Sequence, residues 1–132
     1  FLPATLPAVD GMKVRLHLWT VPGAVFYDES RIAMLQGVDG VVFVADSQRE
    51  RCEANLECLE NLATNLDGRS VARVLQYNKQ DLPNAMSVTE LDEILNPDFV
   101  PAFGASARVG NGVFDTLRAA ANETLARVNL VG

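Results

Sequence analysis

Histidine, cysteine and long apolar stretches are scarce in this sequence. One His and two Cys occur among 132 residues, which disfavours a metal site built from these side chains. No apolar run approaches the roughly 18 residues that a membrane-spanning helix needs, so no membrane span is expected. The first residues, Phe1-Leu2-Pro3, carry neither the charge that opens a signal peptide nor an initiator methionine. We therefore expect the natural protein to begin upstream of Phe1.

Positive charge is also in short supply. The chain has 11 Lys and Arg against 17 Asp and Glu, which gives a net charge of −6 at pH 7. Surfaces that bind nucleic acid are usually basic, so no nucleic-acid partner is expected. Hydrophobic residues make up 48% of the chain, an ordinary share for a globular protein. The length predicts that residues 1–132 form a single domain.

The two cysteines are predicted to remain thiols. Cys52 and Cys58 lie in one helical pattern, and their spacing turns a helix by about 600°, which puts them on opposite sides. A disulfide between them is therefore not expected. Because free thiols are typical of a reducing compartment, the sequence favours a cytoplasmic protein.

Short apolar runs alternate with helical patterns along the chain. Strands are predicted over residues 13–19, 40–46, 71–77 and 99–103, the first of them as the second arm of a hairpin. The continuous apolar runs at 40–46 and 71–77 are typical of strands covered on both faces. Helices are predicted over residues 28–36, 47–66, 87–95 and 113–128, and capping boxes at 47–50 and 87–90 begin two of them.

This alternation predicts an α/β fold with a mostly parallel sheet and right-handed crossovers. In such sheets ligands bind beyond the carboxyl ends of the strands. The loops that follow Trp19, Tyr77 and Phe103 should therefore meet on one rim.

The most informative motif on that rim is Asn78-Lys79-Gln80-Asp81, directly after a predicted buried strand. The Asp81 carboxylate can accept hydrogen bonds from two adjacent N–H groups of a guanine edge, a donor pair that adenine lacks. The aliphatic stem of Lys79 can lie across the base plane, and the Asn78 amide can join neighbouring loops. The motif is short, and a polar turn in which Asp81 caps the next segment is the alternative.

Two other loops are predicted to complete the pocket. Ala105-Ser106-Ala107 follows the last predicted strand, and its small side chains allow backbone N–H groups to approach the same base. Gly23, after the break at 20–22, can offer its N–H to a terminal phosphate. A plain loop of small residues is the alternative at 105–107.

The chain resembles the Ras-like small GTPases and, within them, the MglA branch of bacterial gliding-motility and polarity GTPases. The most specific stretches are residues 17–23, 25–27, 37–47 and 76–85. The tetrad Thr20-Val21-Pro22-Gly23 is characteristic of that branch, since most small GTPases carry Asp where this chain has Thr20.

The resemblance implies a Ras-like P-loop NTPase fold, a three-layer α/β arrangement around a mixed, mostly parallel sheet. It also implies a GTP- and GDP-binding site. The guanine contacts would come from Asn78, Lys79 and Asp81. Ser106 and Ala107 would form the last nucleotide loop, with Arg108 replacing a more usual lysine. Gly23 would contact the γ-phosphate, and residues 24–36 would form the second switch.

One departure from the family pattern is the phosphate loop. No G-x-x-x-x-G-K-[ST] occurs, and the first switch with its Mg²⁺-binding threonine is missing too. We therefore expect an N-terminally incomplete domain whose first strand, central in Ras-like sheets, is absent. Its absence would leave unpaired strand edges. Mg²⁺ is expected only with the missing N-terminal part, and the 132-residue chain alone is not expected to hydrolyse GTP.

A second departure is Ala24, which occupies the position where the family usually has a glutamine that orients the attacking water. Alanine cannot do so, and no catalytic residue is predicted in this chain. We expect the complete protein to hydrolyse GTP slowly or with groups supplied by a partner.

The sequence therefore favours a guanine-nucleotide switch over two alternatives. By the resemblance, its partner would be a Roadblock-type regulatory protein, and its role cell polarity or motility. The main alternative is a nucleotide-free Ras-like scaffold that acts as a protein-interaction module. Another kind of α/β enzyme is disfavoured because the sequence shows no nucleophile elbow, paired carboxylates or metal-ligand spacing.

Overall fold

The computed structural model describes residues 2–9, 12–18, 37–66 and 71–131. The strands are β1 (Leu2–Val9), β2 (Met12–Leu18), β3 (Gly40–Asp46), β4 (Ala72–Asn78) and β5 (Ala102–Gly104). The helices are α2 (Cys52–Leu66), α3 (Val88–Leu95) and α4 (Val113–Val131), with short 3-10 turns η1 (Arg49–Arg51) and η2 (Ala107–Val109). Each predicted helix and strand in the described ranges is present, and the predicted helix at 28–36 lies outside them.

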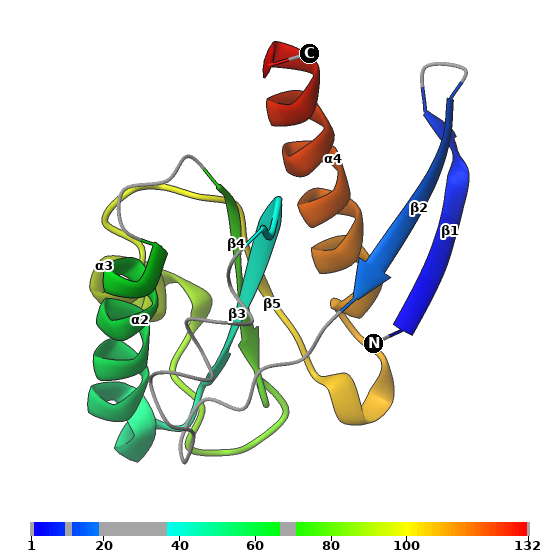
Figure 1. Cartoon of the computed structure of the whole chain (residues 1–132). Helices are drawn as coiled ribbons and strands as arrows, with labels where there is room; N and C mark the ends of the chain where they lie inside the picture. Colours follow the sequence, from blue (N-terminus) through cyan, green and yellow to red (C-terminus); the bar gives the residue numbers. More distant parts are fainter. Residues whose placement is uncertain (1, 10–11, 19–36, 67–70, 132) are drawn as a thin grey trace.

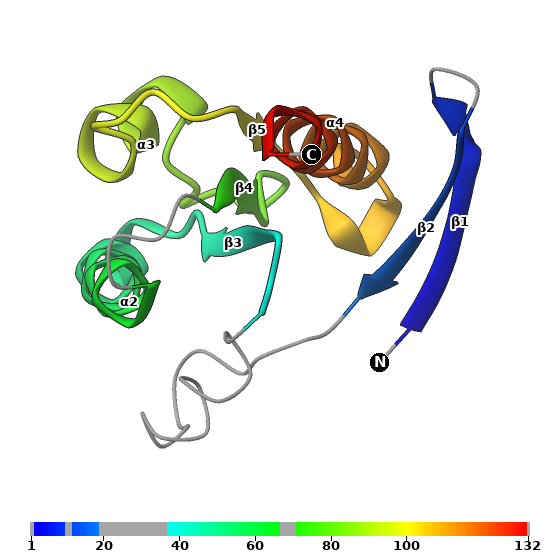
Figure 2. The same cartoon turned by 45° about the horizontal axis from the view of Figure 1, so that its top comes forward.

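A parallel sheet is the centre of the fold. Its strand order is β3-β4-β5, and both pairings are parallel, so all three strands end at the same edge. Helices α2 and α3 cover one face and α4 covers the other, as Figures 1 and 2 show. The predicted three-layer α/β architecture is therefore confirmed for this part of the chain.

The hairpin β1–β2 forms a second, antiparallel sheet. It lies on the α4 side of the parallel sheet (Figure 1). Its first arm ends at Val9. Within the described residues, β3 pairs with β4 alone, so its other edge is open. The described strands thus form two separate sheets, and the parallel one has an open edge at β3.

The main apolar core lies between the parallel sheet and the α2–α3 layer. It is built from buried side chains of β3, β4, the loop after β4 and α3, namely Ala45, Leu75, Tyr77, Met86, Leu91 and Leu95. On the opposite face of β4, the Gln76 amide donates to Thr116 Oγ1 of α4 at 2.8 Å, and both residues are buried. The sheet is thus fixed on both sides by contacts that begin in β4.

The prediction that the apolar run of β3 is covered on both faces is wrong. Phe43 and Ala45 pack into the core, whereas Val42 and Val44, on the α4 side, are 38% and 54% exposed. Helix α4 reaches this face at Gly40, where an added Cβ would meet Thr124 Oγ1, but it leaves the two valines open.

One of the two predicted capping boxes is wrong. The box at Ser87 is present, because Ser87 Oγ accepts from Glu90 N at 3.1 Å and Ser87 N donates to Glu90 Oε1 at 3.3 Å. Ser47 caps no helix; it is buried, and its hydroxyl accepts from Gln80 Nε2 at 2.8 Å. The chain instead enters α2 through η1.

The last strand is shorter than the predicted 99–103. Phe99 lies outside it with a positive φ of 54° and is largely exposed. No helix in the described residues combines the length and apolar character needed to cross a membrane.

Candidate functional site

The carboxyl ends of the three parallel strands form a single rim. Asp46 of β3 is in register with Asn78 of β4, and Tyr77 of β4 is in register with Gly104 of β5. The ladders continue one residue past these pairs, because Ser47 N donates to Asn78 O at 2.9 Å and Ala105 N to Tyr77 O at 2.8 Å. The loops after β3, β4 and β5 are therefore brought together. Of the three loops predicted to meet on one rim, those after Tyr77 and Phe103 do so, and the one after Trp19 lies outside the described residues.

Two residues of the Asn-Lys-x-Asp motif bind the loop after β5. Asn78 Oδ1 accepts a hydrogen bond from Ala107 N at 2.9 Å. Asp81 Oδ1 accepts one from Ser106 Oγ at 2.8 Å. The predicted role of Asn78 in joining neighbouring loops is thus present in the structure, and both predicted nucleotide loops lie side by side. Ser106 is buried and Asp81 is exposed, so a buried hydroxyl orients a side chain that solvent can reach.

The backbone N–H groups of 105–107 have acceptors within the protein. Ala105 N donates to Tyr77 O, Ser106 N donates to Asn111 O, and Ala107 N donates to Asn78 Oδ1. The Ala105 and Ser106 bonds hold the loop against its own scaffold. Ala105 and Ser106 are buried, whereas Ala107 is exposed. Ala107 is therefore the residue of this loop that an incoming ligand can reach.

Lys79 points to the other side of the rim. Its backbone has a positive φ of 67°, which turns the chain sharply out of β4, and Leu82 N closes the turn onto Lys79 O at 3.1 Å. Its ammonium group lies 2.9 Å from Asp46 Oδ2 at the end of β3. Asn78 and Asp81 are therefore tied to the β5 loop, whereas Lys79 is tied to β3.

Asp46 is a site residue that the sequence analysis did not identify. Partial desolvation acts to raise the pKa of its carboxyl group, but hydrogen bonds from Lys79 and Gln48 outweigh it and hold that pKa below its usual value. Its position at the end of a buried strand, level with Asn78, is the signal that could have revealed it.

Gln80 was also missed, although it is the variable position of the motif. Its backbone N donates to Ala105 O at 3.0 Å, and its side-chain amide donates to Ser47 Oγ at 2.8 Å and Met86 O at 3.0 Å. Gln80 thus fastens the motif loop to the loops after β3 and β5. A long amide side chain at the centre of a polar motif is only a weak sequence signal for this role.

Of the remaining predicted site residues, the structure describes Arg108 alone. Arg108 lies exposed in η2, next to Ala107. Gly23 and Ala24 lie outside the described residues, as does the predicted second switch at 24–36. Their roles stay predictions.

The described residues do not supply a Mg²⁺ site. Among them, no group of three His, Cys, Asp or Glu side chains is placed to hold a metal ion. The acid nearest the rim of β3, Asp46, has both carboxylate oxygens engaged by Lys79 and Gln48.

A cavity of about 200 Å³ opens elsewhere, between the sheet, α2 and α3. Its lining includes Val41 and Arg73, the second residues of β3 and β4, so it lies toward the amino ends of these strands. The cavity is therefore separate from the rim that carries the motif.

Comparison with known proteins agrees with this geometry. Residues 4–123 match the model of the ADP-ribosylation factor family. The chain is 53% identical to the mutual gliding-motility protein MglA of Myxococcus xanthus (strain DK1622) over 137 aligned residues, which cover all of this chain and 70% of that protein. It is also 31% identical over 115 residues to elongation factor 4 of Sorangium cellulosum (strain So ce56), covering 85% of this chain and 18% of that protein.

The family match spans both loops of the site and the three strands that carry them. The alignment with MglA covers the whole chain, so it includes every stretch on which the resemblance was based. This chain therefore belongs to the ADP-ribosylation factor family of Ras-like GTPases.

Proposed function

We propose that this protein is a guanine-nucleotide switch of the MglA type that binds GTP and GDP through Asn78, Lys79 and Asp81. Family membership implies guanine-nucleotide binding, and the identity to a gliding-motility protein supports a switch in motility or cell polarity. The observation that carries the proposal is the pair of bonds that fixes Asn78 to Ala107 and Asp81 to Ser106.

The chemistry of the rim suits guanine. A carboxylate has about four acceptor positions, and Ser106 uses one of those on Asp81. The remaining positions can accept from the adjacent N1–H and N2–H groups of guanine. Adenine presents no such donor pair, so an exposed and oriented Asp81 selects guanine over adenine.

A nucleotide-free scaffold is the second candidate. Ala24, which stands where the family usually has a glutamine, favours it. The intact hydrogen bonds of Asn78 and Asp81 disfavour it, because a protein-interaction module does not need an oriented base-binding carboxylate.

Hydrogen–deuterium exchange on the full-length protein separates these candidates. The protein would be loaded with GDP or with a non-hydrolysable GTP analogue, and amide exchange compared. A switch predicts that exchange in residues 24–36 differs between the two states, because a γ-phosphate orders switch segments. Identical exchange in both states, and in the absence of nucleotide, would instead support the scaffold.

We propose a Roadblock-type regulatory protein as the partner, on the strength of the resemblance to MglA. The partner would bind the GTP-loaded form more tightly than the GDP-loaded form. Calorimetry with a purified Roadblock-domain protein and each loaded form tests this, and equal affinities would exclude nucleotide-dependent recognition.

We further propose a cytoplasmic location and a Mg²⁺ requirement that depends on the phosphate-binding part of the protein. The thiols of Cys52 and Cys58, which are not joined in a disulfide, support a reducing compartment. The Mg²⁺ requirement is checked by measuring GDP affinity of the full-length protein with and without EDTA.

A further inference from the structure

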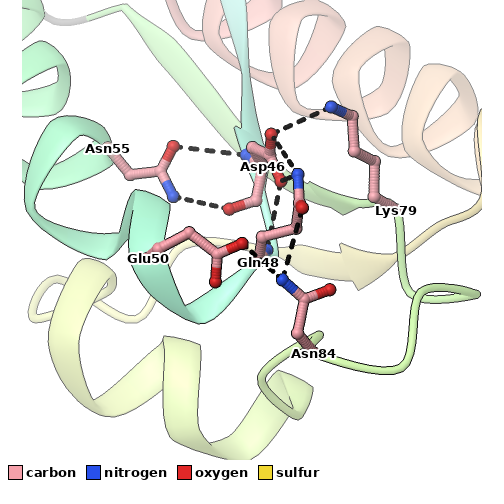
Figure 3. Close-up of polar contacts among 6 residues, drawn as sticks. All are labelled: Asp46, Gln48, Glu50, Asn55, Lys79 and Asn84. Atoms are coloured by element: carbon pink, nitrogen blue, oxygen red, sulfur yellow. Dashed lines mark hydrogen bonds and ion pairs between the residues drawn. The ribbon is translucent and has the colours of Figure 1, made fainter.

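Lys79 is held by a carboxylate on a neighbouring strand. Its Nζ lies 2.9 Å from Asp46 Oδ2, so the side chain spans from the loop after β4 to the end of β3 (Figure 3). The proposed guanine contacts Asn78 and Asp81 are both bonded to the loop after β5 instead. The motif is therefore fastened in two directions.

Asp46 is fixed without any help from Lys79. Gln48 donates to Asp46 Oδ1 from its backbone N at 3.1 Å and from Nε2 at 3.0 Å, and Nε2 also lies 3.1 Å from Oδ2. The buried Asn55 of α2 clamps the Asp46 backbone, because Asp46 N donates to Asn55 Oδ1 at 3.2 Å and Asn55 Nδ2 donates to Asp46 O at 2.7 Å. The carboxylate thus has a defined position into which the lysine fits.

Gln48 is itself oriented by the segment after the motif. Asn84 Nδ2 donates to Gln48 Oε1 at 3.3 Å and to Glu50 Oε1 at 2.5 Å (Figure 3). The order of support is therefore Asn84, then Gln48, then Asp46, with Lys79 at the end of the chain of contacts.

Folding stability does not account for this arrangement. The Lys79 side chain is 48% exposed and that of Asp46 is 22% exposed, and ion pairs with this much solvent contact contribute little to folding. A lysine side chain is flexible, however, and ordering it when a ligand arrives weakens binding. A lysine that is ordered beforehand avoids this loss.

We propose that Asp46 is a positioning residue that holds the Lys79 stem in place against the guanine base, with Gln48 fixing the Asp46 carboxylate. This rests on the proposed guanine-nucleotide function. Asp46 does not contact the nucleotide itself and acts through Lys79 alone.

A double-mutant cycle on the full-length protein tests the proposal. GDP affinity and dissociation rate would be measured for wild type, Asp46→Asn, Lys79→Met and the double variant. Lys79→Met keeps an aliphatic stem but removes the ammonium group that pairs with Asp46. Asp46→Asn should weaken GDP binding about tenfold, mainly through faster dissociation, whereas in the Lys79→Met background it should change affinity less than about twofold.

Two further variants complete the experiment. Asp46→Glu should restore part of the affinity because it keeps the carboxylate. Gln48→Met should cause a smaller loss, about threefold, that also disappears in the Lys79→Met background. It keeps the Asp46–Lys79 pair, so it provides the test if Asp46→Asn fails to fold.

Asp98→Asn is the matched control. It breaks the exposed Arg73–Asp98 pair, which has an N–O distance of 3.0 Å and involves the amino end of β4. It should leave GDP affinity unchanged. The positioning role would be overturned if Asp46→Asn lowered GDP affinity equally in the wild-type and Lys79→Met backgrounds. It would also be overturned if Asp46→Asn caused no loss of GDP affinity in the wild-type background. If wild-type protein bound no GDP or GTP, the proposed function itself would fall, and the inference with it.

Discussion

At the scale of single residues, the exposed Asp81 is oriented by the buried Ser106. Ser106 Oγ donates to Asp81 Oδ1 at 2.8 Å, which fixes the orientation of the Asp81 side chain. Base choice should therefore depend on the acceptor character of this side chain.

Asp81→Asn should change the base preference of the site from guanine to xanthine. An asparagine offers one acceptor and one donor, and the donor matches the carbonyl that xanthine has where guanine has an amino group. GDP affinity should fall at least about hundredfold, and xanthosine diphosphate should bind more tightly than GDP. Competition titrations on the full-length protein check this. Unchanged preference for GDP would rule out Asp81 as the base-selecting residue.

Ala24→Gln should speed GTP hydrolysis. Alanine cannot orient an attacking water, whereas a glutamine at this position can, so we expect an increase of at least about tenfold. Single-turnover phosphate release from the full-length protein measures it. Ala24→Leu is the size control and should give no increase, and equal rates for Ala24→Gln and wild type would contradict the assigned position.

At the scale of elements, β4 is bonded to both layers around the sheet. Tyr77 is fully buried, and its hydroxyl donates to Asp92 Oδ1 of α3 at 2.6 Å. Burial raises the pKa of Tyr77, and the bond to Asp92 raises it further. The bond therefore couples α3 to the strand that carries the motif.

Tyr77→Phe should destabilise the fold by about 1–3 kcal/mol at pH 7, because Asp92 loses a charge-assisted bond. The folded Tyr77 stays neutral where the unfolded tyrosine ionises, so its contribution is present below about pH 10 and is lost as the pH rises beyond it. Urea unfolding at pH 7 and pH 11 measures both effects. If Tyr77→Phe lost as much stability between pH 7 and pH 11 as wild type, the loss could not be assigned to ionisation of Tyr77.

The two capping boxes show how far element boundaries can be predicted. Ser87 and Glu90 satisfy each other locally, so the pattern alone was sufficient. Ser47 has the same pattern, but Gln80, 33 residues away, donates to its hydroxyl. A contact between distant loops overrides the local preference, and such contacts are not visible in the sequence.

At the scale of the whole molecule, the sheet has an open edge beside exposed apolar side chains. Strand β3 pairs on one side within the described residues, and Val44 is 54% exposed. Open edges with apolar faces promote association between chains.

Val44→Lys should therefore reduce self-association of the 132-residue chain, since lysine near an edge discourages strand pairing. Light scattering after size-exclusion chromatography measures the effect over a concentration series. Val109→Lys, which replaces another exposed valine in η2, is the control and should leave association unchanged. Equal association in all three proteins would exclude the β3 edge as the contact surface.

The sequence predicted the parallel sheet, its three layers and the loops that meet at Asn78 and Ser106. It did not predict Asp46 or Gln80, because their roles depend on the register between β3 and β4 and on loop contacts. It also overestimated the cover on β3, because apolar composition does not state which face is covered.

A calorimetric titration of the full-length protein with GDP and then with ADP tests the central claim most directly. Both ligands carry the same phosphates, so their difference reports the base alone. We predict that GDP binds at least about a hundredfold more tightly than ADP, because the Asp81 carboxylate accepts from the guanine donor pair. Equal binding of the two nucleotides, or no binding of GDP, would contradict a guanine site formed by Asn78, Lys79 and Asp81.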